Sequence, residues 1–215
     1  AGLVRAIAHV AEDGRVERVA FRNVPSFVYA RDLATEVPGY GQLTVDVAFG
    51  GAFYAIVPAE RVGLRVAPEQ TTQLVAAGEA IKRAVDATVS IRHPFEEDLG
   101  FLYGTILTGP AEDSAHHSCN ICVFANAEVD RSPTGTGVSA RLALDHAKGE
   151  LARDQPIAIE SILGRHSVFS GRVVDIGAVG PYDAIVPEVS GTAFISGRHE
   201  FVVDSNDSIG QGFLL

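Results

Sequence analysis

The sequence contains no methionine, only two cysteines, and markedly fewer basic than acidic side chains. Its 17 lysine and arginine residues against 27 aspartate and glutamate residues give a formal net charge of −10. The basic residues form no cluster, which argues against nucleic acid and against anionic membrane surfaces as partners. No uninterrupted apolar run is long enough to span a bilayer. We therefore expect neither nucleic acid nor a membrane among the partners.

The two cysteines, Cys119 and Cys122, form a C-x-x-C pattern with His116 and His117 just upstream. A redox C-x-x-C normally opens a helix, whereas this one lies in a strand-like run. Residues three apart on a strand point to opposite faces, and no second Cys/His cluster completes four metal ligands. We expect buried, unreactive cysteines, no metal and no cofactor. Because two cysteines provide no disulfide framework, a reducing cytoplasm is the expected compartment.

The absence of methionine includes the first position, where the chain starts Ala1-Gly2-Leu3-Val4 and enters strand-like sequence at once. We expect from this beginning that a preceding part of the protein is missing. The 215 residues suffice for one large domain or two small ones. A content of 47% hydrophobic and 20% charged residues is ordinary for a globular protein.

Short strands dominate what is present, and helices are expected at only two places. Alternation of apolar and polar residues predicts a hairpin from residues 3–10 and 16–21. Helical spacing predicts one helix over 68–89 and a second, rich in small residues, over 138–151. Without regular βαβ alternation, the fold class is α+β with a mainly antiparallel sheet, not a Rossmann sheet. Further strands are expected at 24–30, at 42–49 with a continuation into 50–57 across a paired glycine, and at 101–108, 118–125, 157–163, 168–176, 184–189 and 192–203, before a terminal loop over 204–215.

The most informative stretch is residues 130–140, a polar Gly-rich turn between an apolar strand at 121–125 and the second helix. Such a helix start leaves backbone N–H groups unpaired, and with the helix dipole they make an anion site. The alternative is an ordinary helix start capped by Thr134 or Thr136, and spacing alone favours this alternative. Asp130 at the mouth would repel a plain anion. A zwitterion such as an amino acid would satisfy both groups.

Other candidate groups have simpler explanations. Ser132 and Ser139 lack the G-x-S-x-G turn of a serine nucleophile. His93, before a proline, is expected to anchor a loop rather than to act as a base. The acidic run 96–98 is expected to be a solvated surface.

Several motifs together resemble the proline racemase family, and the resemblance runs nearly end to end. The central stretch is the longest and most specific of them. The segments that carry the resemblance are 123–125, 129–137, 139–141, 23–27, 46–54 and 212–215.

The resemblance implies a fold like that of diaminopimelate epimerase, with two similar halves, each a curved sheet around a central helix. Here it implies one half over residues 1–190, with a second helix outside, and a return segment over 191–215 that completes the missing first domain. It also implies a proline derivative as the substrate, bound between the halves. Asp130 would contact the ring nitrogen, Gly135 and Thr136 the carboxylate, and Phe124 the ring.

Two departures from the family pattern decide the expected activity. Racemases of the family have their second catalytic cysteine where this sequence has Thr134, and a threonine hydroxyl cannot serve as a base near neutral pH. Threonine here marks the trans-3-hydroxy-L-proline dehydratases, whose reaction needs one base and yields Δ1-pyrroline-2-carboxylate. Thr134 would then orient the substrate or help the leaving hydroxyl. The motif Met-Cys-Gly-His-Gly, which carries the first catalytic cysteine, is absent, so the chain alone is expected to be inactive.

Two other functions stay open. The intact protein would be a proline racemase or hydroxyproline 2-epimerase if position 134 tolerates threonine, or a non-catalytic amino-acid-binding or interaction module. A homodimer also stays open. Residues from 192 onward are expected either to find an intermolecular partner or to be poorly ordered, since they would normally pair with the missing half.

Overall fold

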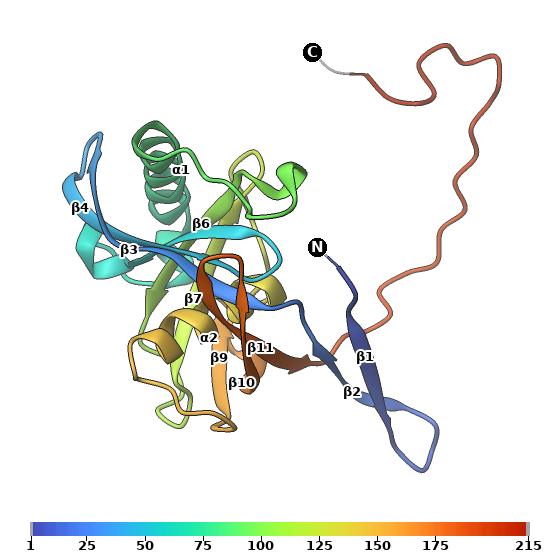
Figure 1. Cartoon of the computed structure of the whole chain (residues 1–215). Coiled ribbons are helices and arrows are strands. Elements are labelled where there is room, and N and C mark those ends of the chain that lie inside the picture. Colours follow the sequence, from blue (N-terminus) through green and yellow to red (C-terminus); the bar gives the residue numbers. More distant parts are fainter. Residues whose placement is uncertain (1, 214–215) are drawn as a thin grey trace.

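The structure, a computed structural model, describes residues 2–213, and its strands join into one curved sheet (Figure 1). All pairings are antiparallel except β5 with β6 and β7 with β9. The sheet order is β1-β2-β11-β10-β9-β7-β6-β5-β4-β3, with β8 beside β7. This confirms the α+β class with a mainly antiparallel sheet. The strands are β1 (Arg5–Val10), β2 (Val16–Arg22), β3 (Ser26–Val37), β4 (Gly41–Phe49), β5 (Phe53–Pro58), β6 (Leu102–Gly109), β7 (Ser118–Phe124), β8 (Glu128–Val129), β9 (Ile157–Ser161), β10 (Gly164–Val179) and β11 (Tyr182–Gly191).

The sheet closes on itself around helix α2 (Gly135–Ala147). Strand β11 pairs with β3 as well as with β10, through Ala184 opposite Phe27, and this pairing completes a ring of eight strands. Val138 and Leu142 of the helix pack against β9, β10 and β11. Ala140 and Leu144 pack against β4 to β7. Residues 137–145 are all buried, so α2 is a central helix with strands on every side.

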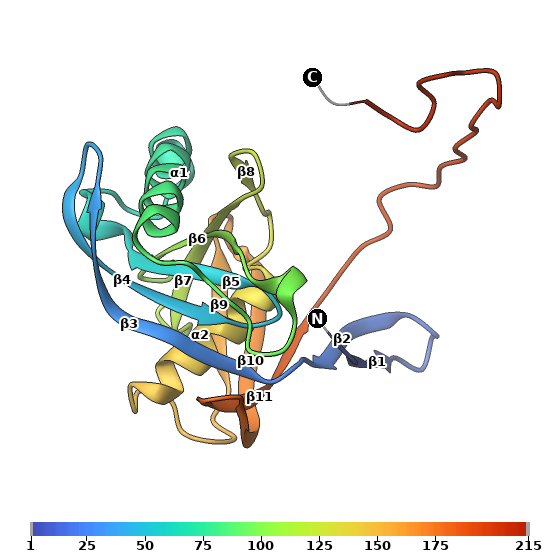
Figure 2. The same cartoon turned by 45° about the horizontal axis from the view of Figure 1, so that its top comes forward.

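Helix α1 (Thr71–Thr88) lies on the other side of strands β3 to β5 from α2 (Figure 2). A 3₁₀ turn at Pro68–Gln70 precedes it. Helical structure therefore begins at Pro68, as expected, but its first turn is 3₁₀ rather than α-helical. The contact is close at Gly78, where a Cβ would lie 2.8 Å from the Val123 side chain. Within residues 2–213, no helix is long and apolar enough to cross a membrane. The residues that α1 buries are Leu74, Ala77, Gly78, Ile81, Ala84 and Val85.

Helix α2 begins at Gly135, three residues before the expected start at 138. The Val138 N–H donates to the Thr134 carbonyl at 2.7 Å, which closes the first helical turn over the glycines. Glycine lowers helix propensity, so the sequence pattern misplaced this boundary. At the other end the helix stops at Ala147 rather than 151. Gly149, at φ 76°, accommodates the left-handed turn that follows.

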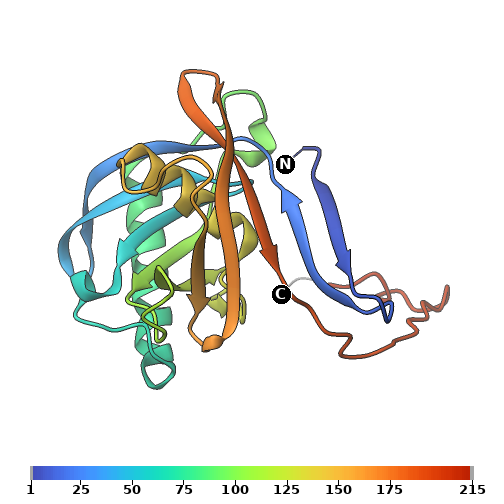
Figure 3. The same cartoon turned by 90° about the horizontal axis from the view of Figure 1, so that it is seen from below.

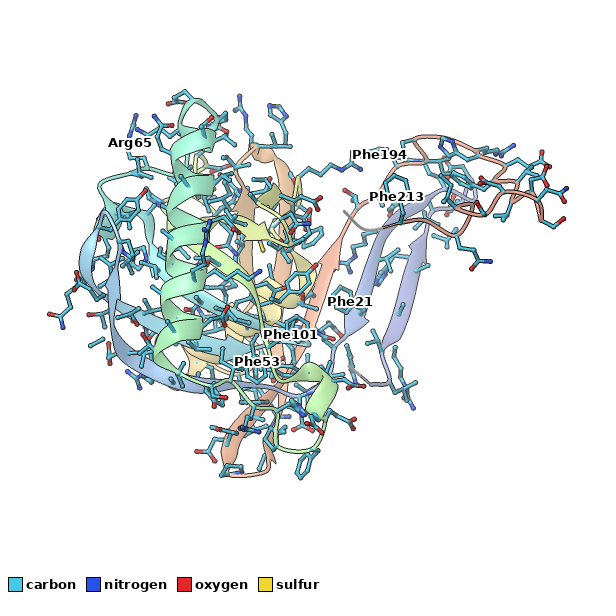
Figure 4. The ribbon with its side chains drawn as sticks, turned by 90° about the horizontal axis from the view of Figure 1, so that it is seen from above. Phe21, Phe53, Arg65, Phe101, Phe194 and Phe213 are labelled. Carbon is cyan, nitrogen blue, oxygen red and sulfur yellow. The ribbon has the colours of Figure 1, made fainter. Side chains whose placement is uncertain are left out.

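The β1–β2 hairpin and residues 192–213 leave the ring of strands on the same side (Figure 3). The expected hairpin is confirmed, with Arg5 opposite Arg22. The expected strand over 192–203 is wrong: the residues have no strand partner, and a strand needs one to satisfy its backbone groups. Phe194 and Phe213 lie on this segment, away from the ring of strands, and are 83% and 67% exposed (Figure 4).

A buried carboxylate fixes the loop between β6 and β7. Glu160 of β9 is fully buried and accepts hydrogen bonds from the N–H groups of Glu112 (2.7 Å) and Asp113 (3.0 Å). Its Oε1 also lies 2.7 Å from Nδ1 of His116. Burial by itself raises the pKa of Glu160, but these hydrogen bonds outweigh it, so the pKa lies below its usual value.

Glu160→Gln is expected to lower the free energy of unfolding by about 2 kcal/mol at pH 7, because it removes a charged acceptor from three donors. The folded-state pKa is below the unfolded value of about 4.3, so the wild-type advantage is complete above that value and lost as the pH falls through the folded pKa. Urea unfolding at pH 7, 5 and 3 measures this. The exposed Glu17→Gln is the control and should change little. A deficit that stays constant down to pH 3 would contradict the assignment.

Gly50, just after β4, lies against the first turns of α2. A Cβ at this position would overlap the Thr136 carbonyl oxygen and lie 2.5 Å from the Ala140 nitrogen. We expect Gly50→Ala to lower the free energy of unfolding by about 2 kcal/mol or more, since the helix must move. Gly177→Ala is the matched control, because nothing lies within 4 Å of its added Cβ. Equal unfolding midpoints in urea for the two variants would refute this close packing.

Candidate functional site

The N-terminus of α2 is open, as the anion-site hypothesis requires. Thr134 occupies the N-cap position, yet it makes no side-chain cap. Its hydroxyl donates to Asp130, and the Thr136 hydroxyl pairs with Tyr54, so neither threonine caps the helix. The N–H groups of residues 135–137 have no hydrogen-bond partner within the part of the chain that the structure describes. The ordinary capped start is therefore not what forms, and the unpaired N–H groups are available to donate hydrogen bonds to an anion.

Thr134 itself has a strained backbone. Its φ of 67° and ψ of 108° fall outside the regions that a β-branched residue normally occupies. Ser132 Oγ accepts the Thr134 N–H at 3.1 Å and helps to hold this conformation. Strain of this kind costs of order 1–3 kcal/mol and is concentrated at functional sites. The strained residue here stands directly before the open helix start.

Asp130 follows β8 and lies half-buried beside the helix start. One carboxylate oxygen accepts the Ser132 N–H at 2.8 Å, and the other accepts the Thr134 hydroxyl at 3.0 Å. The Asp130 N–H in turn points to the Cys122 carbonyl at 3.4 Å. Asp130 and Thr134 thus form a hydrogen-bonded pair next to the uncapped helix start.

Aromatic side chains on the sheet form a continuous row that ends at the start of α2. Phe124, at the end of β7, stacks on Tyr103 with ring centres 5.5 Å apart and an angle of 11°. Tyr103 meets Tyr54 edge to face at 5.7 Å, and the Tyr54 hydroxyl lies 2.6 Å from Oγ1 of Thr136. These contacts join Phe124 to the helix start. Both tyrosines were missed from the sequence, although alternation along β5 would have turned Tyr54 toward α2.

A buried hydrogen-bond cluster holds the helix start in place. Asn23 Nδ2 donates to the Gly50 carbonyl at 2.7 Å and to Ser139 Oγ at 2.9 Å. Ser139 Oγ donates to the Gly135 carbonyl at 3.0 Å. Ser139 is thus occupied as a support and not placed as a nucleophile. Phe21 covers the turn from the hairpin side, where a Cβ on Gly135 would lie 3.0 Å from its ring (Figure 4).

Neither thiol is prepared for proton transfer. Cys119 Sγ donates to the Ser161 carbonyl at 3.1 Å, while Cys122 belongs to the cluster that faces α2. Burial raises the pKa of each thiol to about 12. The expectation of buried cysteines is confirmed. Among residues 2–213, no group of three or more His, Cys, Asp or Glu side chains is arranged to hold a metal ion.

His93 has the anchoring position expected of it. Its Nδ1 accepts the N–H of Glu96 at 3.1 Å, and its ring lies 4.8 Å from that of Phe49. Burial lowers the pKa of His93. The side chain therefore fixes the loop that follows α1.

A cleft of about 490 Å³ opens beside Asp130. Its walls come from residues 130–132, from Leu163 and residues 166–169 around the start of β10, and from the beginning of the 192–213 segment. Ser167 Oγ donates to the Arg131 carbonyl at 2.8 Å and ties two of these walls together. Asp130 is thus reachable from outside.

Known proteins with similar sequences extend beyond this chain. A trans-3-hydroxy-L-proline dehydratase of Colwellia psychrerythraea is 44% identical over 214 residues, and one of Homo sapiens is 47% identical over 216 residues. Each match covers the whole of this chain but only 59% and 60% of the relative. The chain therefore spans about three fifths of the length of the relatives that it matches.

Solved structures also match this chain over its whole length. A probable proline racemase from Agrobacterium radiobacter, with bound carbonate, has a TM-score of 0.90 at 33% identity, and the match covers all of this chain and 62% of that one. A hydroxyproline epimerase from Agrobacterium vitis, with bound trans-4-OH-L-proline, has a TM-score of 0.90 at 32% identity and 60% coverage. The family model described as proline racemase matches residues 1–214. This chain belongs to the proline racemase family.

Proposed function

We propose that the complete protein dehydrates trans-3-hydroxy-L-proline to Δ1-pyrroline-2-carboxylate, and that this chain supplies the half of the site that holds the substrate. Relatives 44% and 47% identical carry the name of this activity. In the reaction a base removes the α-proton, the 3-hydroxyl leaves as water after taking up a proton, and the resulting enamine tautomerises to the imine.

The observation that carries the proposal is Thr134. Racemisation needs an acid and a base on opposite faces of the α-carbon, each able to change protonation near neutral pH. The residue at the helix start is a hydroxyl that donates to a carboxylate, 3.0 Å away, and it cannot become such a base. Elimination needs one base only. A hydroxyl group hydrogen-bonded to Asp130 is suited instead to orient the substrate or to assist the departing 3-hydroxyl.

The remaining groups suit a zwitterionic ring. The open N–H groups of Gly135 and Thr136, with the helix dipole, would receive the carboxylate. Asp130 would offer its negative charge to the ring ammonium, and Phe124 would pack on the ring face. Opposite charges within one small site select for a ligand that carries both.

The base must come from a part of the protein outside this chain. Both thiols here have a pKa of about 12, so neither yields enough thiolate at neutral pH. We propose that residues 1–190 form the second half of a diaminopimelate epimerase-like fold. Residues 191–215 would then be a return segment for the missing first half, an assignment supported by the exposure of residues 192–209 and 211–213.

A second candidate is hydroxyproline 2-epimerisation. The structural similarity to a hydroxyproline epimerase with bound trans-4-OH-L-proline favours it at the level of the fold. An assay in D2O distinguishes the two reactions by their products. An epimerase gives deuterated product of inverted configuration with no loss of water, whereas a dehydratase releases water.

The proposed function predicts turnover of trans-3-hydroxy-L-proline by the complete protein, with loss of one water detected by mass spectrometry. The chain alone should show no turnover, because groups that act as a unit lose nearly all activity when separated. Adding the missing part as a separate polypeptide should restore it. No dehydration by the complete protein would overturn the proposal, and D-configured product without dehydration would establish the epimerase instead.

The complete protein should keep its turnover when the thiols of this chain are removed. Cys119→Ala and Cys122→Ala are expected to retain kcat within about threefold, because a thiol with a pKa of about 12 supplies no base at pH 7. Asp130→Asn is the contrasting variant and should lose about 100-fold in kcat/KM, as expected for loss of a charged contact. A loss in Cys122→Ala as large as in Asp130→Asn would show that this thiol takes part.

A further inference from the structure

Tyr54 is a polar residue in the centre of the molecule whose hydroxyl has one partner. The side chain is fully buried on β5, on the face that meets α2. Its neighbour Phe53 faces the other side of the sheet, in the core beneath α1. The Tyr54 hydroxyl lies 2.6 Å from Oγ1 of Thr136, the second residue of α2. No other hydrogen bond of either hydroxyl is found among residues 2–213.

The direction of this hydrogen bond follows from the surroundings. The Tyr54 ring packs edge to face against Tyr103 in the same core cluster as Cys122, and burial raises the pKa of the phenol far above its usual value. A phenol that keeps its proton at every ordinary pH needs an acceptor for it, and the Thr136 oxygen is the acceptor in reach. When Thr136 accepts through its oxygen, its own proton is available to a second partner.

The candidate for that second partner is the substrate carboxylate proposed to bind at the helix start. Thr136 is half-buried in the first turn of α2, next to the backbone N–H groups that have no partner in the described chain. Under the proposed function the substrate carboxylate binds at those N–H groups, in the same helical turn as the Thr136 hydroxyl. Hydrogen bonds to charged groups are stronger than neutral ones, so the orientation of this one hydroxyl matters.

We propose that Tyr54 is a positioning residue of the carboxylate site: its hydroxyl donates to Thr136 Oγ1 and thereby directs the Thr136 hydroxyl proton toward the substrate carboxylate. This inference deepens the proposed function and rests on it for the identity of the anion. Phenylalanine would fill nearly the same volume at position 54. Packing alone therefore does not require the hydroxyl group of Tyr54.

The test measures the binding of pyrrole-2-carboxylate to the complete protein by calorimetry. This planar ring has the carboxylate but neither an sp³ α-carbon nor a 3-hydroxyl, so it reports binding without turnover. Tyr54→Phe is expected to weaken binding about fivefold, the worth of one oriented hydrogen bond. Thr136→Val should weaken it at least as much, and Thr136→Ser should retain the affinity. In the Thr136→Val background, Tyr54→Phe should add no further loss, because its effect passes through that hydroxyl.

Tyr182→Phe is the matched control, since it removes a tyrosine hydroxyl from the separate core cluster beneath α1, where the Tyr182 ring stacks on Phe27, and it should leave affinity unchanged. Should Tyr54→Phe fail to fold, site-specific 3-fluorotyrosine at position 54, a stronger donor of similar shape, should tighten binding. An unchanged affinity in Tyr54→Phe or with fluorotyrosine, or the same loss with and without the Thr136 hydroxyl, would overturn the inference.

The outcomes also separate the inference from the proposed function. If the wild-type protein binds pyrrole-2-carboxylate but does not dehydrate the substrate, the function fails while the coupling of Tyr54 to Thr136 is still measured. Dehydration with no effect of Tyr54→Phe defeats the inference alone. Absence of pyrrole-2-carboxylate binding in the wild type defeats the inference, while the dehydration assay alone decides the function.

Discussion

The hydrogen bond from the Thr134 hydroxyl to Asp130 is the interaction on which the site depends. It draws the threonine side chain away from the helix that it would otherwise cap, and so it leaves the first N–H groups of α2 open. The backbone strain at Thr134 is the energetic cost of this arrangement. One hydrogen bond therefore accounts for both the uncapped helix start and the placement of the carboxylate beside it. A capped helix would be more stable and would hold no ligand.

A strained turn needs a rigid support, and the central position of α2 provides it. The helix is enclosed by eight strands, with small residues where the strands come close. Asn23, just after β2, links Ser139 of the helix to the Gly50 carbonyl, just after β4. Since a helix buried on all sides has one low-energy position, its N-terminus is fixed in direction as well as in place. In the same way, the proposed hydrogen bond from Tyr54 to Thr136 fixes the direction of one hydroxyl proton at the helix start.

Local patterns in the sequence were enough to predict most of the fold. Hairpins, buried helices and antiparallel strands each have a hydrophobic periodicity that is recognisable within a short stretch of residues. The start of α2 was misplaced since glycine is a poor helix residue, while the contacts that enforce helix there are distant in sequence. The strand expected at 192–203 failed for a related reason: apolar alternation predicts a strand only where a partner exists, and none is present in residues 2–213. Tyr54 lies 82 residues from Thr136, so only folding brings the two hydroxyls together.

The ionisable groups of the candidate site are better suited to holding a charged ligand than to removing a proton from it. Binding a charged ligand requires fixed charges and dipoles. The candidate site has an uncapped helix start, the Asp130 carboxylate and the hydroxyls of Thr134 and Thr136. Proton abstraction asks for a group whose pKa lies near neutrality, yet both thiols here are buried with a pKa of about 12. Burial that makes α2 rigid also suppresses thiolate formation beside it. A rigid cradle and a responsive base are therefore more compatible on two surfaces that meet over the substrate than on one.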